Sequence, residues 1–322
     1  MFSDPHPRPA IPTLLQLASE AQVVALTDSH GRLEEYQLIR DLVCDSASPN
    51  HFDDILIELG NSRYQDVLDA YIAGDNVPFD ELAQVWRNTF GSGFSQLPDS
   101  PVYPELLETV RAVNQNAHHR KKIRVLAGDP PIEWQAIQTV DDLVGWIKQD
   151  QGRDPNAAEI LNRECLSAGR RALILYGGMH IMHRQNRSTL THILETRHSI
   201  HIPVVIAHGP HGSDLEDLDC RLENWPVPSI AMVAGTWLGQ LPLHRHLTGN
   251  MRMSGERLPP DTTPWQEAFD ALLYLGPGSK ATFVNGDSST LPDDYVQECA
   301  RRRAIHEDLF AMARAGEWPP QA

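Results

Sequence analysis

Short runs of apolar residues recur along the first two thirds of the chain, and segments with helical spacing separate them. The runs are apolar throughout rather than alternating, which is typical of strands covered on both faces. Strands that alternate with helices predict a mainly parallel sheet between two helical layers. The predicted strands are residues 23–27, 55–58, 123–127, 172–176, 203–207, 230–233 and 271–275.

The segments between the strands complete this α/β pattern. Residues 32–43 predict an amphipathic helix directly behind the first strand. A helical insert at about residues 64–116 separates the second and third strands, and it is either a lid over the sheet or a packing subdomain. Residues 241–264 have no clear period and predict a long surface loop, whereas residues 292–313 predict a helix on an outer face. We therefore expect residues 1–322 to form a single three-layer α/β domain.

Composition limits the range of partners. The chain has 322 residues, of which 41% are hydrophobic, and a formal net charge of −16. A strongly acidic protein does not favour nucleic acid or anionic lipid, so we expect neither nucleic acid nor membrane as a partner. The sequence contains no apolar run long enough to span a bilayer and no secretory signal pattern, so we expect a cytoplasmic protein that acts on a small molecule. The oligomeric state stays open.

Polar side chains follow four of the predicted strands. His30 follows the first strand, Glu58 ends the second, Asp129 ends the third, and His180 follows the fourth after a glycine pair. Because ligands bind at the carboxyl ends of strands in open α/β sheets, we expect these four catalytic residues to meet at one edge. A neutral histidine with an ordinary pKa accepts a proton near neutral pH, so His30 is our expected general base.

Further side chains near these strand ends are candidates for binding the substrate. A carboxylate at the end of an apolar strand needs a cation, a metal or a proton, and Arg63 or His30 is the partner that we expect for Glu58. Arg63 is also suited to clamping a carboxylate or phosphate group. We expect five substrate-binding residues, namely Asp28, Glu34, Asn61, Arg63 and His183.

Two histidines and a carboxylate are also metal-ligand types. His30, Glu58 and His180 are the ligands that we expect if a divalent ion such as zinc, manganese or iron binds at this edge. Their spacing in the sequence does not select one metal, and the identity of any cofactor stays open.

The order of these motifs resembles the superfamily of the erythromycin esterases, the ChaN-like haem-uptake lipoproteins and the Tiki/TraB proteins. Its first motif, a strand and a His-Gly turn followed by a helical acid, is similar to His30, Gly31 and Glu34. Its second motif, a strand that ends in glutamate, is similar to residues 55–58, and a later glycine-rich turn before histidine is similar to residues 176–180. The resemblance implies an α/β fold of the erythromycin-esterase and ChaN type.

The resemblance implies a hydrolase of esters, amides or phosphoesters. In that interpretation His30 activates water, Glu58 orients it, and Arg63 or His180 stabilises the developing oxyanion, with a metal optional. One alternative is a haem- or metal-binding protein with His30 and His180 as ligands. Another is a hydrolase similar to the metallophosphoesterases, whose first motif resembles residues 28–31. A non-catalytic protein that keeps the fold is the remaining class.

Overall fold

The structure of the chain is a computed structural model. It describes residues 2–92, 99–116, 121–149, 152–183, 188–248, 250, 252–253, 256–257, 260–286 and 291–316. Residues 93–98 of the predicted insert, and residues 249, 251, 254–255 and 258–259 of the predicted surface loop, therefore lie outside the described residues.

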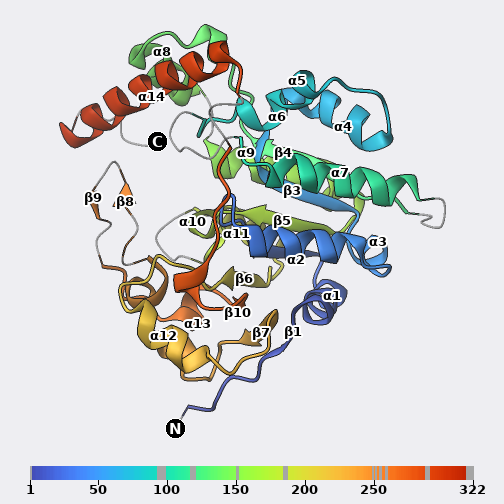
Figure 1. The fold of residues 1–322 in the computed structure, drawn as a ribbon, viewed down its shortest axis with the longest axis vertical. Helices are drawn as coiled ribbons and strands as arrows, with labels where there is room; N and C mark the ends of the chain where they lie inside the picture. Colours follow the sequence, from blue (N-terminus) through green and yellow to red (C-terminus); the bar gives the residue numbers. More distant parts are fainter. Residues whose placement is uncertain are drawn as a thin grey trace.

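A central sheet of eight strands organises the fold (Figure 1). Its order is β1-β7-β10-β6-β2-β5-β3-β4, and the six strands from β10 to β4 are parallel. Strands β7 and β1 run antiparallel at one end. The strands are β1 (Arg8–Pro9), β2 (Val23–Thr27), β3 (Asp54–Asn61), β4 (Arg124–Asp129), β5 (Ala172–Tyr176), β6 (Val204–Ala207), β7 (Ser229–Met232) and β10 (Ala271–Tyr274). The predicted α/β class and its mainly parallel sheet are confirmed.

Helices on one face of the sheet bury every second strand residue. Val24 and Leu26 of β2 point into this layer, with Leu173 and Leu175 of β5 beside them. Side chains at alternate positions of a strand point to opposite faces, so a continuous apolar strand serves two cores at once. The helices of this face are α1 (Ala10–Glu20), α2 (Leu33–Cys44), α3 (Ser48–His51), α4 (Gln65–Ala73) and α7 (Val102–Gln115).

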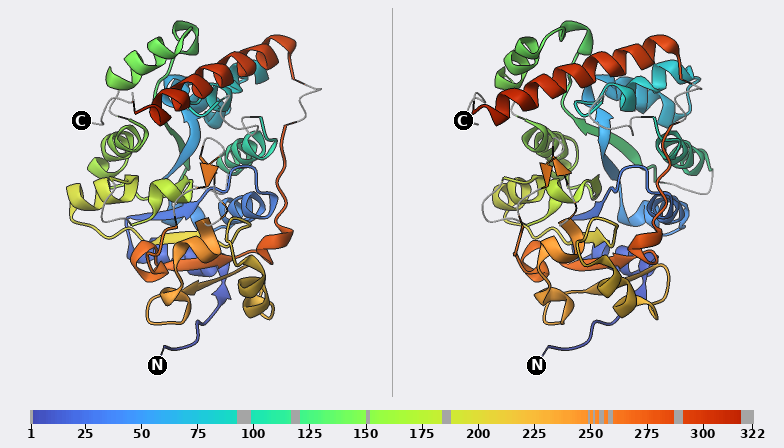
Figure 2. Two further views of the ribbon diagram at one scale, coloured as in Figure 1. Left: turned by 90° about the vertical axis from the view of Figure 1, so that its left-hand side faces the viewer. Right: turned by 60° about the vertical axis from the view of Figure 1, so that its left-hand side comes forward.

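The remaining side chains of the same strands point to the opposite face of the sheet. Ala25 of β2 and Ile174 of β5 pack there against Leu161 and Leu194 of the covering helices. The two further views of the ribbon show the helical layers on either side of the sheet (Figure 2). The helices of this second face are α9 (Arg153–Glu164), α10 (Gly178–Ile181), α11 (Leu190–His198), α12 (Leu215–Leu222) and α13 (Trp265–Ala268).

A third, smaller core lies beyond the carboxyl end of β4. Trp134 and Leu143 pack there against Ile305 and Leu309 of the last helix. The helices α8 (Val140–Gln149) and α14 (Asp293–Arg314) lie side by side at the top of Figure 1, where α14 is red. The prediction of a C-terminal helix on an outer face is therefore confirmed.

The predicted insert contributes to packing. Helices α4 and α7 pack on the sheet face beside α2, and the short helices α5 (Phe79–Leu82) and α6 (Gln84–Arg87) continue that layer. Trp86 of α6 is fully buried. The predicted surface loop includes a π-helical turn at His244–Thr248 and a two-strand ribbon, β8 (Arg252–Met253) and β9 (Glu256–Arg257). Within the described part of the chain, no helix combines the length and apolar character needed to cross a bilayer.

Candidate active site at the carboxyl edge

The four predicted catalytic residues come from four neighbouring strands. Strands β2, β5, β3 and β4 are adjacent in that order, and they are followed or ended by His30, His180, Glu58 and Asp129 respectively. Because these strands are parallel, their carboxyl ends meet at the same edge of the sheet. We call the group that gathers there the carboxyl-edge site. It consists of Asp28, His30, Glu58, Asp129, Arg153, Asp154 and His180.

Glu58 is the centre of the carboxyl-edge site. Its Oε1 lies 3.5 Å from Nε2 of His30 and 3.6 Å from Nε2 of His180. Its Oε2 accepts a hydrogen bond of 2.6 Å from the backbone N–H of Gly177, in the turn that follows β5. Burial alone would raise the pKa of Glu58, but His30, His180 and Arg153 lower it well below its usual value. Glu58 is therefore ionised, and both imidazoles face it.

Of the two partners that we expected for Glu58, His30 contacts it and Arg63 does not, and Arg153 supplies the guanidinium instead. It is the first residue of α9, and its guanidinium donates to Oε1 of Glu58 at 2.9 Å and to Oδ1 of Asp129 at 2.7 Å. The other carboxylate oxygen of Asp129 accepts from the backbone N–H of Phe90. Burial raises the pKa of Asp129, while Arg153 opposes the shift. One guanidinium thus holds two buried carboxylates, which would be costly without a charged partner.

His30 lies between two carboxylates. Its Nδ1 is 3.2 Å from Oδ2 of Asp28, and Glu58 faces its Nε2. Burial alone would lower the pKa of His30, but the charges of Asp28 and Glu58 raise it well above its usual value. The two carboxylates therefore favour the imidazolium form of His30, whereas we expected a neutral base there from the sequence.

His180 has a different arrangement, which the sequence analysis did not foresee. Its Nδ1 lies 2.5 Å from Oδ1 of Asp154, the second residue of α9. Its Nε2 lies 3.4 Å from Nη1 of Arg153, which can only donate a hydrogen bond. We assign the proton to Nδ1 on the basis of these partners, because Nδ1 then donates to Asp154 and Nε2 accepts from Arg153. Asp154 thereby orients a ring whose unprotonated Nε2 faces Arg153 and Glu58.

The accessible part of the site consists of donors and imidazoles. The side chains of His30, His180 and Arg153 are 30%, 26% and 24% exposed, whereas the Glu58 carboxylate behind them is 3% exposed. A cavity behind Asp28, between Tyr36 and Tyr103, has a volume of about 10 Å³, which is room for about one water. This cavity is therefore too small for an organic ligand.

The other predicted substrate-binding residues lie apart from the site, except for Asp28. Arg63 pairs with Glu133 at 3.0 Å on the surface, and Glu34 accepts from the backbone N–H of Thr282 at 3.0 Å. Asn61 is fully buried and donates to the backbone carbonyls of Asn88 and Ile132 at 2.8 and 2.9 Å, so its amide positions loops.

His183 lies at the other edge of the sheet. Its backbone N–H donates to the carbonyl of Ala268, which precedes β10. The two rings have separate partners, because His180 contacts Asp154 and Arg153 whereas, among the described residues, none of the contacts of His183 belongs to the carboxyl-edge site. Its side chain contacts Glu195 and Asp270.

Sequence signals for Arg153 and Asp154 exist, although they are weak. Gly152 has a φ of 93°, which favours glycine, and a Gly-Arg-Asp-Pro sequence then opens α9. The need of Glu58 for a buried cation was evident from the sequence. Only the fold shows that the cation comes from a helix 95 residues further along the chain.

No protein-family model matches the chain, and no curated protein matches it. Solved structures do match. A protein from Bacillus cereus has a TM-score of 0.61 at 11% sequence identity, covering 88% of this chain and 97% of that protein. A succinoglycan biosynthesis protein has a TM-score of 0.61 at 11% identity, covering 88% of this chain and 96% of that protein. At this identity the likeness shows a shared fold.

An erythromycin esterase variant in its open conformation is also among the matched structures. Its TM-score is 0.49 at 12% identity, and the match covers 85% of this chain and 94% of the esterase. The esterase is one of the relatives that the sequence resemblance named.

Proposed function

We propose that this chain is a hydrolase, with water activated by His180 at the carboxyl edge of the sheet. The observation that carries the proposal is the Asp154–His180 pair, whose contact of 2.5 Å leaves Nε2 turned toward Arg153 and Glu58. A histidine oriented by a carboxylate, with its second nitrogen unprotonated, is a recurring general base, and at His180 water would take the place of the long contact with Arg153. The resemblance to esterases supports the same reaction class.

The proposed reaction has two proton transfers at His180. Water transfers a proton to Nε2 of His180 while its oxygen attacks the carbonyl carbon or phosphorus of the substrate. The protonated ring then returns the proton to the departing alkoxide or amine. Arg153 stabilises the developing oxyanion as a charged, partly exposed donor, and His30 contributes through its positive charge, because both of its ring nitrogens face carboxylates. Glu58 and Asp129 hold these cations in place.

This assignment moves the base from His30, where we expected it from the sequence, to His180. The reason is charge, because an imidazolium ion held by Asp28 and Glu58 cannot accept a further proton. Ester, amide and phosphoester substrates all develop negative oxygen in the transition state. The exposed donors of this site match that shared feature.

A metal ion or a haem does not fit the carboxyl-edge site in this arrangement. Metal ligation by His30, Glu58 and His180 was expected from the sequence. In the structure the Arg153 guanidinium lies among them, 2.9 Å from Glu58 and 3.4 Å from His180. A metal would have to displace this charge, and both ring nitrogens of each histidine already face polar partners. The proposal therefore uses no metal step and no haem.

The test is turnover of model substrates by the wild type and two variants. We expect cleavage of at least one p-nitrophenyl ester, anilide or phosphate. We also expect a loss of about 10²- to 10⁴-fold in kcat/KM for His180→Asn. Asp154→Asn should lower kcat/KM while the far-UV circular dichroism spectrum stays unchanged.

The matched control is His192→Asn, an exposed histidine on α11 that lies outside the site. It should retain wild-type kcat/KM. Wild-type rates in the His180→Asn variant would contradict the proposal, as would the absence of turnover across all three substrate classes.

A further inference from the structure

A second group of histidines and carboxylates lies at the opposite edge of the sheet. His183 follows α10, Glu195 belongs to α11, His201 precedes β6, and Asp270 precedes β10. Asp270 and Val204 exchange backbone and side-chain hydrogen bonds where β6 and β10 begin. We call these four residues the amino-edge cluster. Nothing in the proposed hydrolase mechanism uses them.

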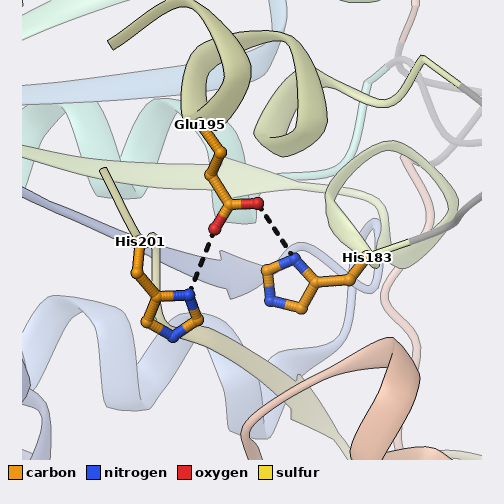
Figure 3. A group of neighbouring side chains, drawn as sticks. All are labelled: His183, Glu195 and His201. Carbon is orange, nitrogen blue, oxygen red and sulfur yellow. Dashed lines mark ion pairs between the residues drawn. The ribbon is translucent and has the colours of Figure 1, made fainter. Parts of the chain in front are cut away.

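Glu195 links the two imidazoles on one side of the cluster. Its Oε2 lies 3.3 Å from Nδ1 of His183, and its Oε1 lies 3.2 Å from Nδ1 of His201 (Figure 3). The two rings are stacked, with centroids 5.6 Å apart. The backbone N–H of Ile202 donates to Oε1 at 2.8 Å and holds the carboxylate in this orientation. Both Nδ1 atoms therefore face one fixed carboxylate.

Asp270 contacts the other nitrogen of each ring. Its Oδ2 lies 3.2 Å from Nε2 of His183, and its Oδ1 lies 3.3 Å from Nε2 of His201. The backbone N–H of Val204 fixes this carboxylate at 2.8 Å. A carboxylate that accepts from the second ring nitrogen is the usual outer partner of metal-binding histidines, because it sets the tautomer. We assign the N–H to Nε2 in both rings, so that both Nδ1 lone pairs point at Glu195.

Such an arrangement needs positive charge between the rings and Glu195, because two lone pairs and a carboxylate repel one another. In the described part of the chain, no lysine or arginine forms an ion pair with Glu195 or Asp270. A divalent cation meets this need and makes the cluster neutral with both imidazoles uncharged.

We propose that Nδ1 of His183, Nδ1 of His201 and the Glu195 carboxylate bind a zinc ion. Ligand atoms of these three residues lie within 4.8 Å of one another. In a tetrahedral site with bonds of 2.0–2.1 Å, neighbouring ligands are about 3.3 Å apart, and the two nitrogen–oxygen contacts already have this spacing. Zinc prefers imidazole nitrogen and carboxylate oxygen, and water would complete the coordination.

The test is a zinc titration of metal-free protein against a chromophoric chelator. We expect wild type to bind one equivalent. His201→Ala should weaken binding by about 100-fold or more, since it removes a direct ligand. His201 is 63% exposed, so its truncation leaves no cavity, and far-UV circular dichroism of the metal-free variant checks the fold. The matched control is His192→Ala, an exposed histidine of α11 outside the cluster that should bind as wild type does.

Two further variants distinguish a zinc ion at the amino edge from one at the carboxyl edge. Asp270→Asn should weaken zinc binding by about 10- to 100-fold, because it removes the group that orients both rings. His180→Asn should leave zinc binding unchanged, since His180 belongs to the other edge. Absence of zinc binding in wild type would overturn the proposal. Binding that survives His201→Ala but is lost in His180→Asn would also overturn it, and would place the metal at the carboxyl edge.

Discussion

The carboxyl-edge site and the amino-edge cluster contain nearly the same residue types, yet we propose opposite ligands for them. Each has two histidines and at least two carboxylates within contact distance. At the carboxyl edge Arg153 lies among them and leaves the carboxylates buried behind accessible donors. At the amino edge the described residues offer no such cation, and Glu195 stays 20% exposed. Under our two proposals, the presence or absence of one guanidinium determines whether a histidine–carboxylate group binds an anion or a cation.

The largest expected effect comes from removing that guanidinium. Arg153→Gln should lower the free energy of unfolding by about 3–5 kcal/mol, because it leaves Glu58 and Asp129 buried beside each other without their shared cation. Urea unfolding measures the change. The control is Arg197→Gln, which breaks an exposed pair with Glu159 and should cost about 1 kcal/mol or less. Equal losses of unfolding free energy in the two variants would mean that the buried ion pairs of Arg153 stabilise the fold no more than an exposed pair does.

A second prediction concerns Glu35, a fully buried acid of α2 near the carboxyl-edge site. Burial raises its pKa to about 7, although Arg32 opposes the shift. The folded state therefore favours the neutral acid, and stability falls as the pH rises from the usual value of 4.5 through about 7. Glu35→Gln should remove this loss and stabilise the protein by about 3 kcal/mol above pH 8.

The same Glu35→Gln substitution should change stability little at pH 4, where the acid is protonated in both states. Thermal unfolding at the two pH values provides the measurement. A gain of equal size at both values would show that the effect comes from packing rather than from ionisation.

A third prediction tests the cation preference of the amino-edge cluster through stability. Zinc at about 100 times its Kd should stabilise the wild type by about 2.7 kcal/mol, because it binds the folded chain. In a thermal melt the shift should be several degrees, and chelator should reverse it. His201→Ala should show no shift, and a shift equal to that of the wild type would locate the stabilising ion elsewhere.

The smallest expected effect is that of His201→Ala in metal-free protein. Its side chain is 63% exposed, and exposed ion pairs contribute about 1 kcal/mol or less. Chemical unfolding in the presence of chelator measures this. A loss several times larger would show that the cluster is an internal support of the fold rather than a ligand site.

The sequence was a good guide to the sheet. All seven predicted strands are present, because a short, continuously apolar run is typical of a strand that is buried on both faces. The two-residue β1 carries no such run, and it was missed. The convergence of His30, Glu58, Asp129 and His180 also followed from strand ends alone, since the carboxyl ends of parallel strands share an edge.

The partners within the site were harder to predict. Arg63 is close to Glu58 in the sequence, but it lies on the surface, whereas Arg153 reaches Glu58 from the start of α9. The sequence predicted His30 as the base from its place after a strand and its ordinary pKa. Our proposal places the base at His180, because the two carboxylates that face His30 became visible only in the fold. The amino-edge cluster joins four separate segments, and no local spacing in the chain indicates it.

The last helix, α14, supports the carboxyl-edge site from a distance, so C-terminal truncation should affect that site. Arg302 of α14 is 2% exposed and donates to the backbone carbonyl of Arg87 and to Asn88, in the loop whose Phe90 N–H contacts Asp129. A protein truncated before residue 293 would keep all eight strands of the central sheet. It would lose the Arg302 contacts that hold the loop beside Asp129. We expect C-terminal truncation to impair turnover well before it impairs solubility.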